Sequence, residues 1–202
     1  KLIILLLMTF IFTGIIISQE EENDDYIGTV AYSQGDQIFS LNAGAVIPLF
    51  TFNLSPEPGE ESFTGLSAVK VGVGGALKWG TFVADNLLVG AELSGMFSLT
   101  ANRTLSMIPL SATAAYYFLA YPFEFPVYIN AGLSFNSLGD YFIINPSIKP
   151  GFGAYWNMDG EWAFGLNFDY WIMPDIYFSE EFEAQSRIGN FLQISLSAVY
   201  HF

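Results

Sequence analysis

The chain has 202 residues, of which 52 % are hydrophobic and 13 % charged, whereas a water-soluble domain carries about 25 % charged residues. Its formal net charge of −14 makes it a poor binder of nucleic acid. Beyond residues 1–18, no apolar run reaches the roughly 18 residues that a membrane-spanning helix needs. A helical membrane protein is therefore not expected, and a closed β-barrel is the other way to satisfy every backbone group within lipid.

The N-terminal segment has the pattern of a secretory signal. Lys1 precedes an almost unbroken apolar stretch over residues 2–17, and a strongly acidic run follows. A positive start, an apolar stretch and a polar exit predict a signal peptide over residues 1–18, with cleavage after Ser18. An uncleaved membrane anchor is the alternative. Residues 19–36 are expected to form an acidic, mobile periplasmic leader.

From Gln37 onward, apolar and polar residues alternate with a period of two, which is typical of β-strands with two different faces. Most of the alternating segments reach the length of a tilted membrane strand, about 9 to 11 residues. In chain order, the predicted strands are 37–50, 69–82, 87–100, 105–118, 127–135, 144–156, 162–172 and 192–202. The sequence thus predicts an all-β, eight-stranded antiparallel transmembrane barrel over residues 37–202.

The strand lysines indicate which face of the sheet meets lipid. Each of them lies on the face opposite the large apolar residues. A lysine that faced lipid at mid-membrane would cost about 2 to 4 kcal/mol, whereas a lysine inside the barrel can be paired. The charged residues predicted to line the lumen are Lys70, Lys78, Glu92, Lys149 and Asp169.

The links between the predicted strands alternate between long and short, as is usual for outer-membrane barrels. An even number of strands places both termini in the periplasm and the long links outside. The expected outer loops carry Glu57, Glu60, Glu61, Glu180, Glu181 and Glu183. The expected periplasmic aromatic girdle comprises Trp79, Phe118, Trp156, Trp162, Tyr200 and Phe202. The expected outer girdle comprises Phe97, Phe135 and Tyr170.

An eight-stranded barrel is just wide enough for side chains to fill it. Tyr117, Tyr128, Tyr155, Trp171 and Phe191 are predicted to point inward, so a wide water-filled pore is not expected.

Two lumenal ion pairs follow from the expected register. If Gly160 takes the left-handed last position of a three-residue hairpin loop, Lys149 lies opposite Asp169. Across the short turn near residue 85, Lys78 lies opposite Glu92 or one pair away. These pairs either neutralise buried charge or form a selective constriction for a small solute.

Four prolines lie inside predicted strands, and each removes a donor from the hydrogen-bond ladder. They are Pro48, Pro109, Pro146 and Pro150. Such prolines mark either a bulge or strand end, or a weak seam through which an apolar molecule leaves sideways into lipid.

The C-terminal strand resembles the signal that outer-membrane insertion machinery recognises, with outward residues that end on an aromatic: Leu196, Ala198, Tyr200 and Phe202. Together with the Gly-Ala-Val-Ile-Pro-Leu stretch at residues 44–49, the chain is similar to the OmpW/OprG-like eight-stranded barrels. The resemblance covers residues 37–202, and it implies passage of small apolar molecules through the outer membrane.

Enzymatic activity is not expected. Some small outer-membrane barrels are hydrolases that use serine and histidine, but the single histidine, His201, is predicted at the periplasmic end, with no carboxylate placed to orient it. No residue cluster has metal-ligand spacing, so neither a metal nor a cofactor is expected. The expected partners are outer-membrane lipids, the insertion machinery and a small hydrophobic solute; the oligomeric state is left open.

The leading function is therefore a narrow passive channel or conduit in the bacterial outer membrane. The alternative is a surface-exposed adhesin or a structural barrel of the envelope that displays the acidic loops.

Overall fold

The computed structural model describes residues 32–54, 62–65, 69–100, 103–139, 141–175 and 186–202. The predicted signal peptide, most of the leader and the six loop glutamates lie outside these ranges. Within them, no helix is long and apolar enough to cross a membrane.

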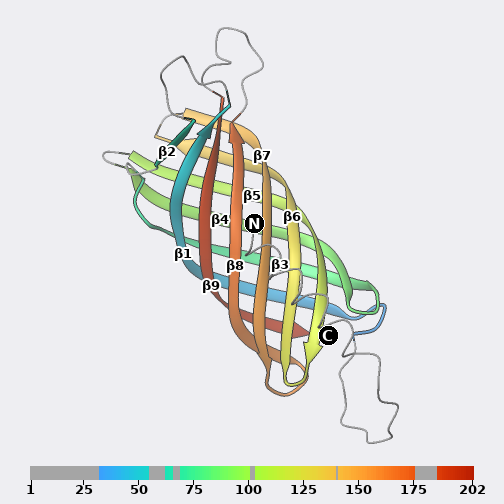
Figure 1. The fold of residues 1–202 in the computed structure, drawn as a ribbon. Helices are drawn as coiled ribbons and strands as arrows, with labels where there is room; N and C mark the ends of the chain where they lie inside the picture. Colours follow the sequence, from blue (N-terminus) through green and yellow to red (C-terminus); the bar gives the residue numbers. More distant parts are fainter. Residues whose placement is uncertain (1–31, 55–61, 66–68, 101–102, 140, 176–185) are drawn as a thin grey trace, which may run out of the picture.

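The described chain forms a closed antiparallel β-barrel (Figure 1). Its strands are β1 (Gln37–Asn53), β2 (Phe63–Gly65), β3 (Gly72–Ala84), β4 (Leu87–Thr100), β5 (Arg103–Ala120), β6 (Phe123–Leu138), β7 (Tyr141–Asn157), β8 (Trp162–Asp175) and β9 (Arg187–His201). Eight long strands follow one another around the barrel, and β1 pairs with β9 to close it. The short β2 pairs only with the end of β1. The predicted eight-stranded barrel is confirmed.

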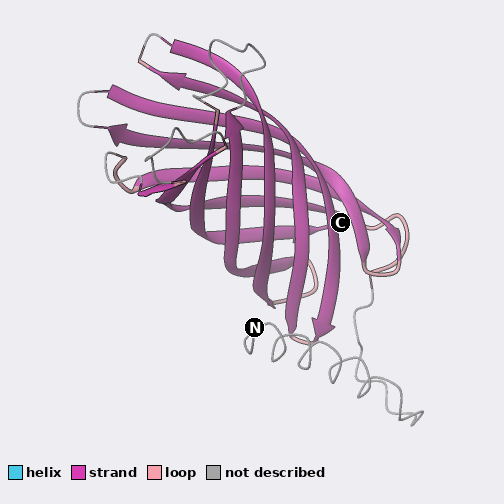
Figure 2. Ribbon diagram, turned by 45° about the horizontal axis from the view of Figure 1, so that its top comes forward, coloured by secondary structure: helices cyan, strands magenta, loops and turns pink. Residues whose placement is uncertain are grey.

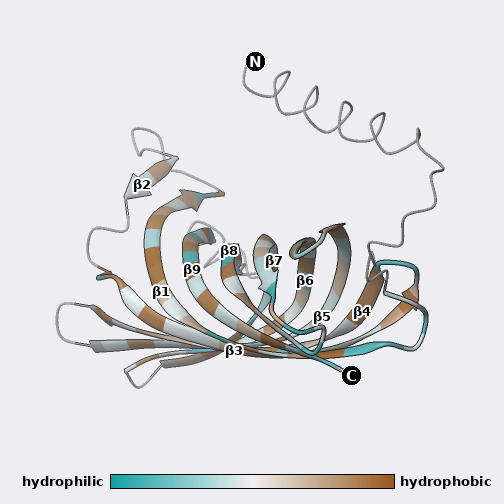
Figure 3. Cartoon of the chain, turned by 90° about the horizontal axis from the view of Figure 1, so that it is seen from below, coloured by the Kyte–Doolittle hydropathy of each residue, from teal (hydrophilic) through white to brown (hydrophobic). Residues whose placement is uncertain are grey.

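The two faces of the sheet differ as the alternating sequence predicted. Leu41, Val73, Val127 and Leu196 point outward, and each exposes more than half of its side chain. Polar strand residues such as Asn130, Ser134, Asn167 and Ser195, together with Lys78, Glu92, Lys149 and Asp169, point inward and are buried. Figure 3 shows the resulting alternation of hydrophobic and hydrophilic segments along the strands. An apolar exterior around a polar interior fits a barrel surrounded by hydrocarbon.

The two ends of the barrel carry different features. The terminal end holds both ends of the barrel chain, where the Gln37 and Phe202 backbones bond to each other. It also holds the short turns between β3 and β4, β5 and β6, and β7 and β8. The opposite end, called the loop end, holds the remaining connections. Several aromatic residues are partly exposed around the terminal end, where the first aromatic girdle was predicted: Trp79, Phe118, Trp156, Trp162 and Phe202.

The β7–β8 turn corrects one predicted register. Asn157 pairs with Ala163, so five residues, 158–162, separate the first paired positions rather than the expected three. The Asn157 side chain accepts a hydrogen bond from the Gly160 backbone (2.7 Å), and the Asp159 side chain accepts one from Trp162 (2.8 Å). Gly160 does have the expected positive φ, 89°. The wider turn moves the pairing by two residues, so Asp169 lies opposite Gly151 and not opposite Lys149.

The β7–β8 ladder is interrupted next to Pro150. Pairing runs from Asn157 to Gly151 and resumes at one position, where Ile148 lies opposite Ile172. Residues 141–147 of β7 pair with β6, but within the described chain they have no partner on β8. Figure 2 shows the strands fanning out toward the loop end. The barrel therefore has a partly unpaired seam between β7 and β8, in its loop-end half.

The other prolines lie elsewhere. Pro48 precedes a register shift between β1 and β9, as expected for a bulge. Pro109 is fully buried on β5, where the pairing with β4 skips two positions. Pro146 lies on β7 within the part that pairs with β6 alone.

Candidate functional site

The lumen is filled by side chains in three layers. The terminal-end cluster comprises Tyr32, Ile38, Phe82, Leu88, Ala115, Tyr117, Tyr128, Tyr155, Ala163 and Val199. The loop-end cluster comprises Val46, Met96, Leu105, Met107, Trp171, Met173 and Phe191. Between these two apolar clusters lies a charged belt formed by Lys78, Glu92, Lys149 and Asp169, all buried. The inward aromatic residues predicted from the sequence are confirmed as parts of this filling.

Both belt lysines converge on one carboxylate. Lys78 and Glu92 lie opposite each other on β3 and β4, as the short turn predicted, with Lys78 Nζ 3.4 Å from Glu92 Oε2. Lys149 reaches across the lumen from β7 and donates to Glu92 Oε1, and it also donates to Ser94 Oγ at 2.6 Å. Because a buried charge is tolerated only when it is paired and hydrogen-bonded, the Glu92 carboxylate offsets the burial of both lysine side chains.

Each of the two ammonium groups also lies over an aromatic ring. Lys78 Nζ lies 3.6 Å from the ring centroid of Tyr128, and Lys149 Nζ lies 4.5 Å from that of Trp171. A desolvated ammonium over an aromatic face gains roughly 2 kcal/mol. The belt is therefore a compact network that blocks the lumen at mid-height.

One predicted ion pair and one predicted lumenal position differ in the structure. Asp169 is buried in the belt, but Lys149 pairs with Glu92 instead, because of the two-residue register change at the β7–β8 turn. Lys70 does not line the packed lumen. It precedes β3 at the loop end, and its side chain is exposed.

A polar cluster that the sequence reasoning missed closes the terminal end. The Tyr32 hydroxyl donates to Glu124 Oε1 (2.6 Å) and lies 2.9 Å from His201 Nε2. Asn157 Nδ2 also donates to Glu124 Oε1 (2.8 Å), and Glu124 Oε2 lies 3.6 Å from His201 Nε2. A carboxylate thus does face His201, contrary to the expectation, because Glu124, the second residue of β6, points inward.

Tyr32 belongs to the segment that was expected to be a mobile leader, yet it is buried inside the barrel end. Its ring stacks on Phe82 with the centroids 4.4 Å apart and meets the edge of Tyr117. Burial, and after it the nearby Glu124 carboxylate, raise the pKa of Tyr32 well above its usual range, so the hydroxyl stays protonated and can donate. An aromatic residue five positions before the first predicted strand is the sequence signal for this buried contact.

Replacing Tyr32 with phenylalanine tests the contacts of the Tyr32 hydroxyl with Glu124 and His201. The ring stays, but Glu124 and His201 lose a buried partner, so we expect unfolding free energy to fall by about 1 to 3 kcal/mol. The measurement is urea unfolding in detergent micelles. Tyr121→Phe is the matched control, because Tyr121 is exposed at the same end. Equal stability of the two variants would contradict the role assigned to the Tyr32 hydroxyl.

The described residues show no metal-type cluster and no serine or threonine hydroxyl beside His201. Within the described ranges, no group of three or more His, Asp or Glu side chains could hold a metal ion. The described contacts of His201 are with Tyr32 and Glu124, and none of them is with a serine or threonine hydroxyl.

Comparison with solved structures shows the same architecture in outer-membrane proteins. Neisserial surface protein A is 12 % identical, with a TM-score of 0.58 over 84 % of this chain and 98 % of that protein. OprG from Pseudomonas aeruginosa is also 12 % identical, with a TM-score of 0.52 over 85 % of this chain and 97 % of that one. At the level of fold, the expected resemblance to the OmpW/OprG-like barrels is confirmed.

Sequence relatives carry the comparison further. An uncharacterized protein of Borreliella burgdorferi (strain ATCC 35210 / DSM 4680 / CIP 102532 / B31) is 28 % identical over 146 residues, which are 61 % of this chain and 66 % of that protein. The match thus spans slightly less than two thirds of the relative. A family model without a functional description matches residues 19–200. Since this match covers most of the sequence, the chain belongs to that uncharacterised family, and it has the fold of a small eight-stranded outer-membrane barrel.

Proposed function

We propose that the protein is a bacterial outer-membrane conduit, with both termini in the periplasm, that admits small apolar molecules at the loop end and releases them sideways into lipid. The observation that carries the proposal is the position of the loop-end cluster. Trp171 and Met173 of this apolar cluster lie on β8. Between Ile172 and the loop end, the described residues of β8 have no partner on β7.

Straight passage through the barrel is opposed by two obstacles. The charged belt fills the middle of the lumen, and ionic groups there are poor neighbours for an apolar molecule. Below the belt, Tyr32, Phe82 and Tyr117 pack ring against ring. An apolar molecule that enters from the loop end therefore finds the lumen closed by the charged belt and by these packed rings.

A sideways route meets less resistance. The loop-end cluster contains Met96, Met107 and Met173, whose flexible side chains can rearrange around ligands of different shape. Beside it, the described residues of the β7–β8 ladder lack pairs around Pro150 and, toward the loop end, beyond Ile148. Separating the strands there breaks few hydrogen bonds. The exterior beyond the seam is apolar and faces lipid, so the route leads from an apolar cluster directly into hydrocarbon.

A reversible disulfide across the seam tests this route. The chain has no cysteine of its own, and Ile148 and Ile172 are cross-strand partners. Antiparallel partners have Cα atoms about 4.5 to 5.5 Å apart, which suits a disulfide. In vesicles, the oxidised Ile148→Cys/Ile172→Cys double variant should take up apolar fluorophores no faster than protein-free vesicles. Reduction should restore the parent rate.

A matched crosslink provides the control. Val127 on β6 and Phe152 on β7 are cross-strand partners that face outward. They lie between the terminal end and Pro150, and they do not bridge the β7–β8 seam. The oxidised Val127→Cys/Phe152→Cys variant should keep the parent uptake rate. Undiminished uptake through the oxidised seam variant would refute lateral release and favour the surface-display role.

A further inference from the structure

The basic residues outside the belt are segregated at one end of the barrel. Of the five lysines and arginines in the described ranges, Lys78 and Lys149 are buried in the belt. The other three, Lys70, Arg103 and Arg187, lie at or just before strand starts at the loop end. Basic side chains at a membrane interface attract anionic headgroups. The loop end is therefore where the described barrel can bind an anionic group.

Lys70 is the basic residue that adjoins a lipid-facing groove. A hollow of about 300 Å³ lies on the outer face between β3 and β4 and reaches the start of β5. Its walls are the outward side chains of Val71, Val73, Phe97 and Leu99, each more than half exposed. Lys70 and Thr104 lie at its loop end. The groove is thus apolar along its length and basic at the end nearest the membrane surface.

The backbone of Lys70 is held in place while its ammonium group stays available. Its backbone N–H donates to the Leu99 carbonyl (3.0 Å), and its own carbonyl accepts a hydrogen bond from Ser98 Oγ. The ion pairs of the described residues join other groups, and none of them involves Lys70 Nζ. This lysine can therefore pair with a charge supplied from outside the protein.

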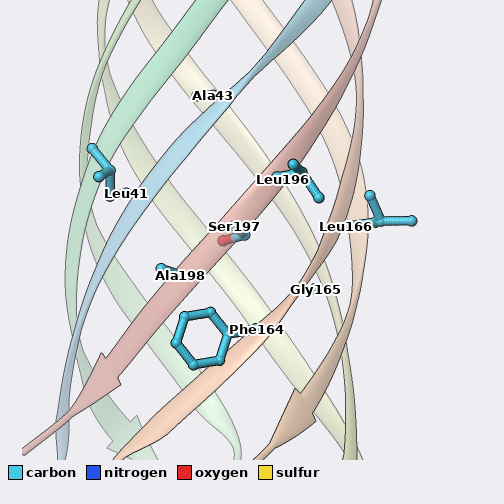
Figure 4. A pocket seen from close by; sticks show the side chains of 8 residues that line it. All are labelled: Leu41, Ala43, Phe164, Gly165, Leu166, Leu196, Ser197 and Ala198. Carbon is cyan, nitrogen blue, oxygen red and sulfur yellow. The ribbon is translucent and has the colours of Figure 1, made fainter.

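A larger hollow elsewhere on the exterior lacks this charge. Figure 4 shows it on the outer face of β1, β8 and β9, where Leu41, Phe164, Leu166 and Leu196 surround small residues. It measures about 610 Å³ and no charged residue lines it. Any acyl chain could occupy this second hollow, but nothing in it would distinguish one headgroup from another.

We propose that the β3–β4 groove binds an anionic, phosphate-bearing membrane lipid, with an acyl chain along Val71, Val73, Phe97 and Leu99 and the phosphate on the Lys70 ammonium. The occupant is a membrane lipid rather than a free anion, because most of the groove surface is apolar and faces hydrocarbon. This inference is independent of the proposed conduit, since the groove and the β7–β8 seam are on different strands.

Native mass spectrometry of the detergent-solubilised protein tests the site with three probes. Phosphatidylglycerol carries chains and phosphate, diacylglycerol carries the same chains without phosphate, and inorganic phosphate carries no chains. We expect the parent protein to bind phosphatidylglycerol more tightly than the other two. Lys70→Gln should weaken phosphatidylglycerol about fivefold, the equivalent of roughly 1 kcal/mol for one basic residue near the surface, and should leave diacylglycerol unchanged.

Further variants separate the groove from general attraction to the loop end. Lys70→Arg should keep the parent affinity, and Phe97→Ala should weaken both lipids because a wall of the groove is lost. Arg187→Gln removes an exposed cation from β9 and should have no effect. The proposal is overturned if Lys70→Gln binds phosphatidylglycerol like the parent, if Arg187→Gln weakens it equally, or if inorganic phosphate binds as tightly as the lipid.

Discussion

Glu92→Ala is expected to lower the free energy of unfolding by about 3 to 5 kcal/mol, the usual cost of removing one partner from a buried ion pair. In the parent, the formal charges of Lys78, Glu92, Lys149 and Asp169 sum to zero, and all four side chains are buried. Removing Glu92 leaves an excess positive charge, and it takes from both lysines the carboxylate that they share. Urea unfolding in detergent micelles would measure the loss.

Two comparison variants isolate the effect of the shared carboxylate. Glu161→Ala removes an exposed carboxylate from the β7–β8 turn and should change stability by less than about 0.5 kcal/mol. Lys78→Met/Glu92→Met restores a neutral belt with apolar side chains of similar length, and it should recover much of the loss. If Glu92→Ala unfolds like Glu161→Ala, the belt is not the electrostatic unit described above.

The sequence alone predicted the eight long strands, the face on which their residues lie, and one of the two lumenal ion pairs. Alternation with period two decides which residues point inward, and a slip of one residue would have put Lys78 and Lys149 into lipid. Lys78 and Glu92 are separated by one short turn, so their pairing depends on local geometry alone.

The remaining contacts depend on features that a linear pattern does not carry. Lys149 meets Glu92 across the lumen, from β7 to β4, which are not neighbouring strands. Such a contact depends on how far each strand is staggered in the closed barrel, and a two-residue change at one turn had already displaced the expected partner. Tyr32 lies before the first strand, where no periodicity signals that its ring enters the barrel.

Trp171→Ala is the change that most directly connects the stability of the lumen with the proposed route. Trp171 is fully buried, donates from Nε1 to Gln193 Oε1 (3.0 Å) and lies beside the Lys149 ammonium. Truncating a buried tryptophan typically costs about 3 to 5 kcal/mol. The same truncation empties space in the loop-end cluster next to the seam. We therefore expect a less stable barrel that takes up apolar fluorophores faster than the parent.

The two effects of Trp171→Ala can be separated with a second tryptophan. Trp156 faces outward near the terminal end and is 50 % exposed, so Trp156→Ala should cost less stability and leave uptake unchanged. Closing the seam with the oxidised Ile148→Cys/Ile172→Cys pair in the Trp171→Ala background should abolish the gain, because the enlarged cluster would then have no exit into lipid. Faster uptake that persisted with this crosslink would mean that the molecules cross the lumen through the charged belt. A loss of stability without faster uptake would mean that Trp171 contributes to packing and not to the lateral route.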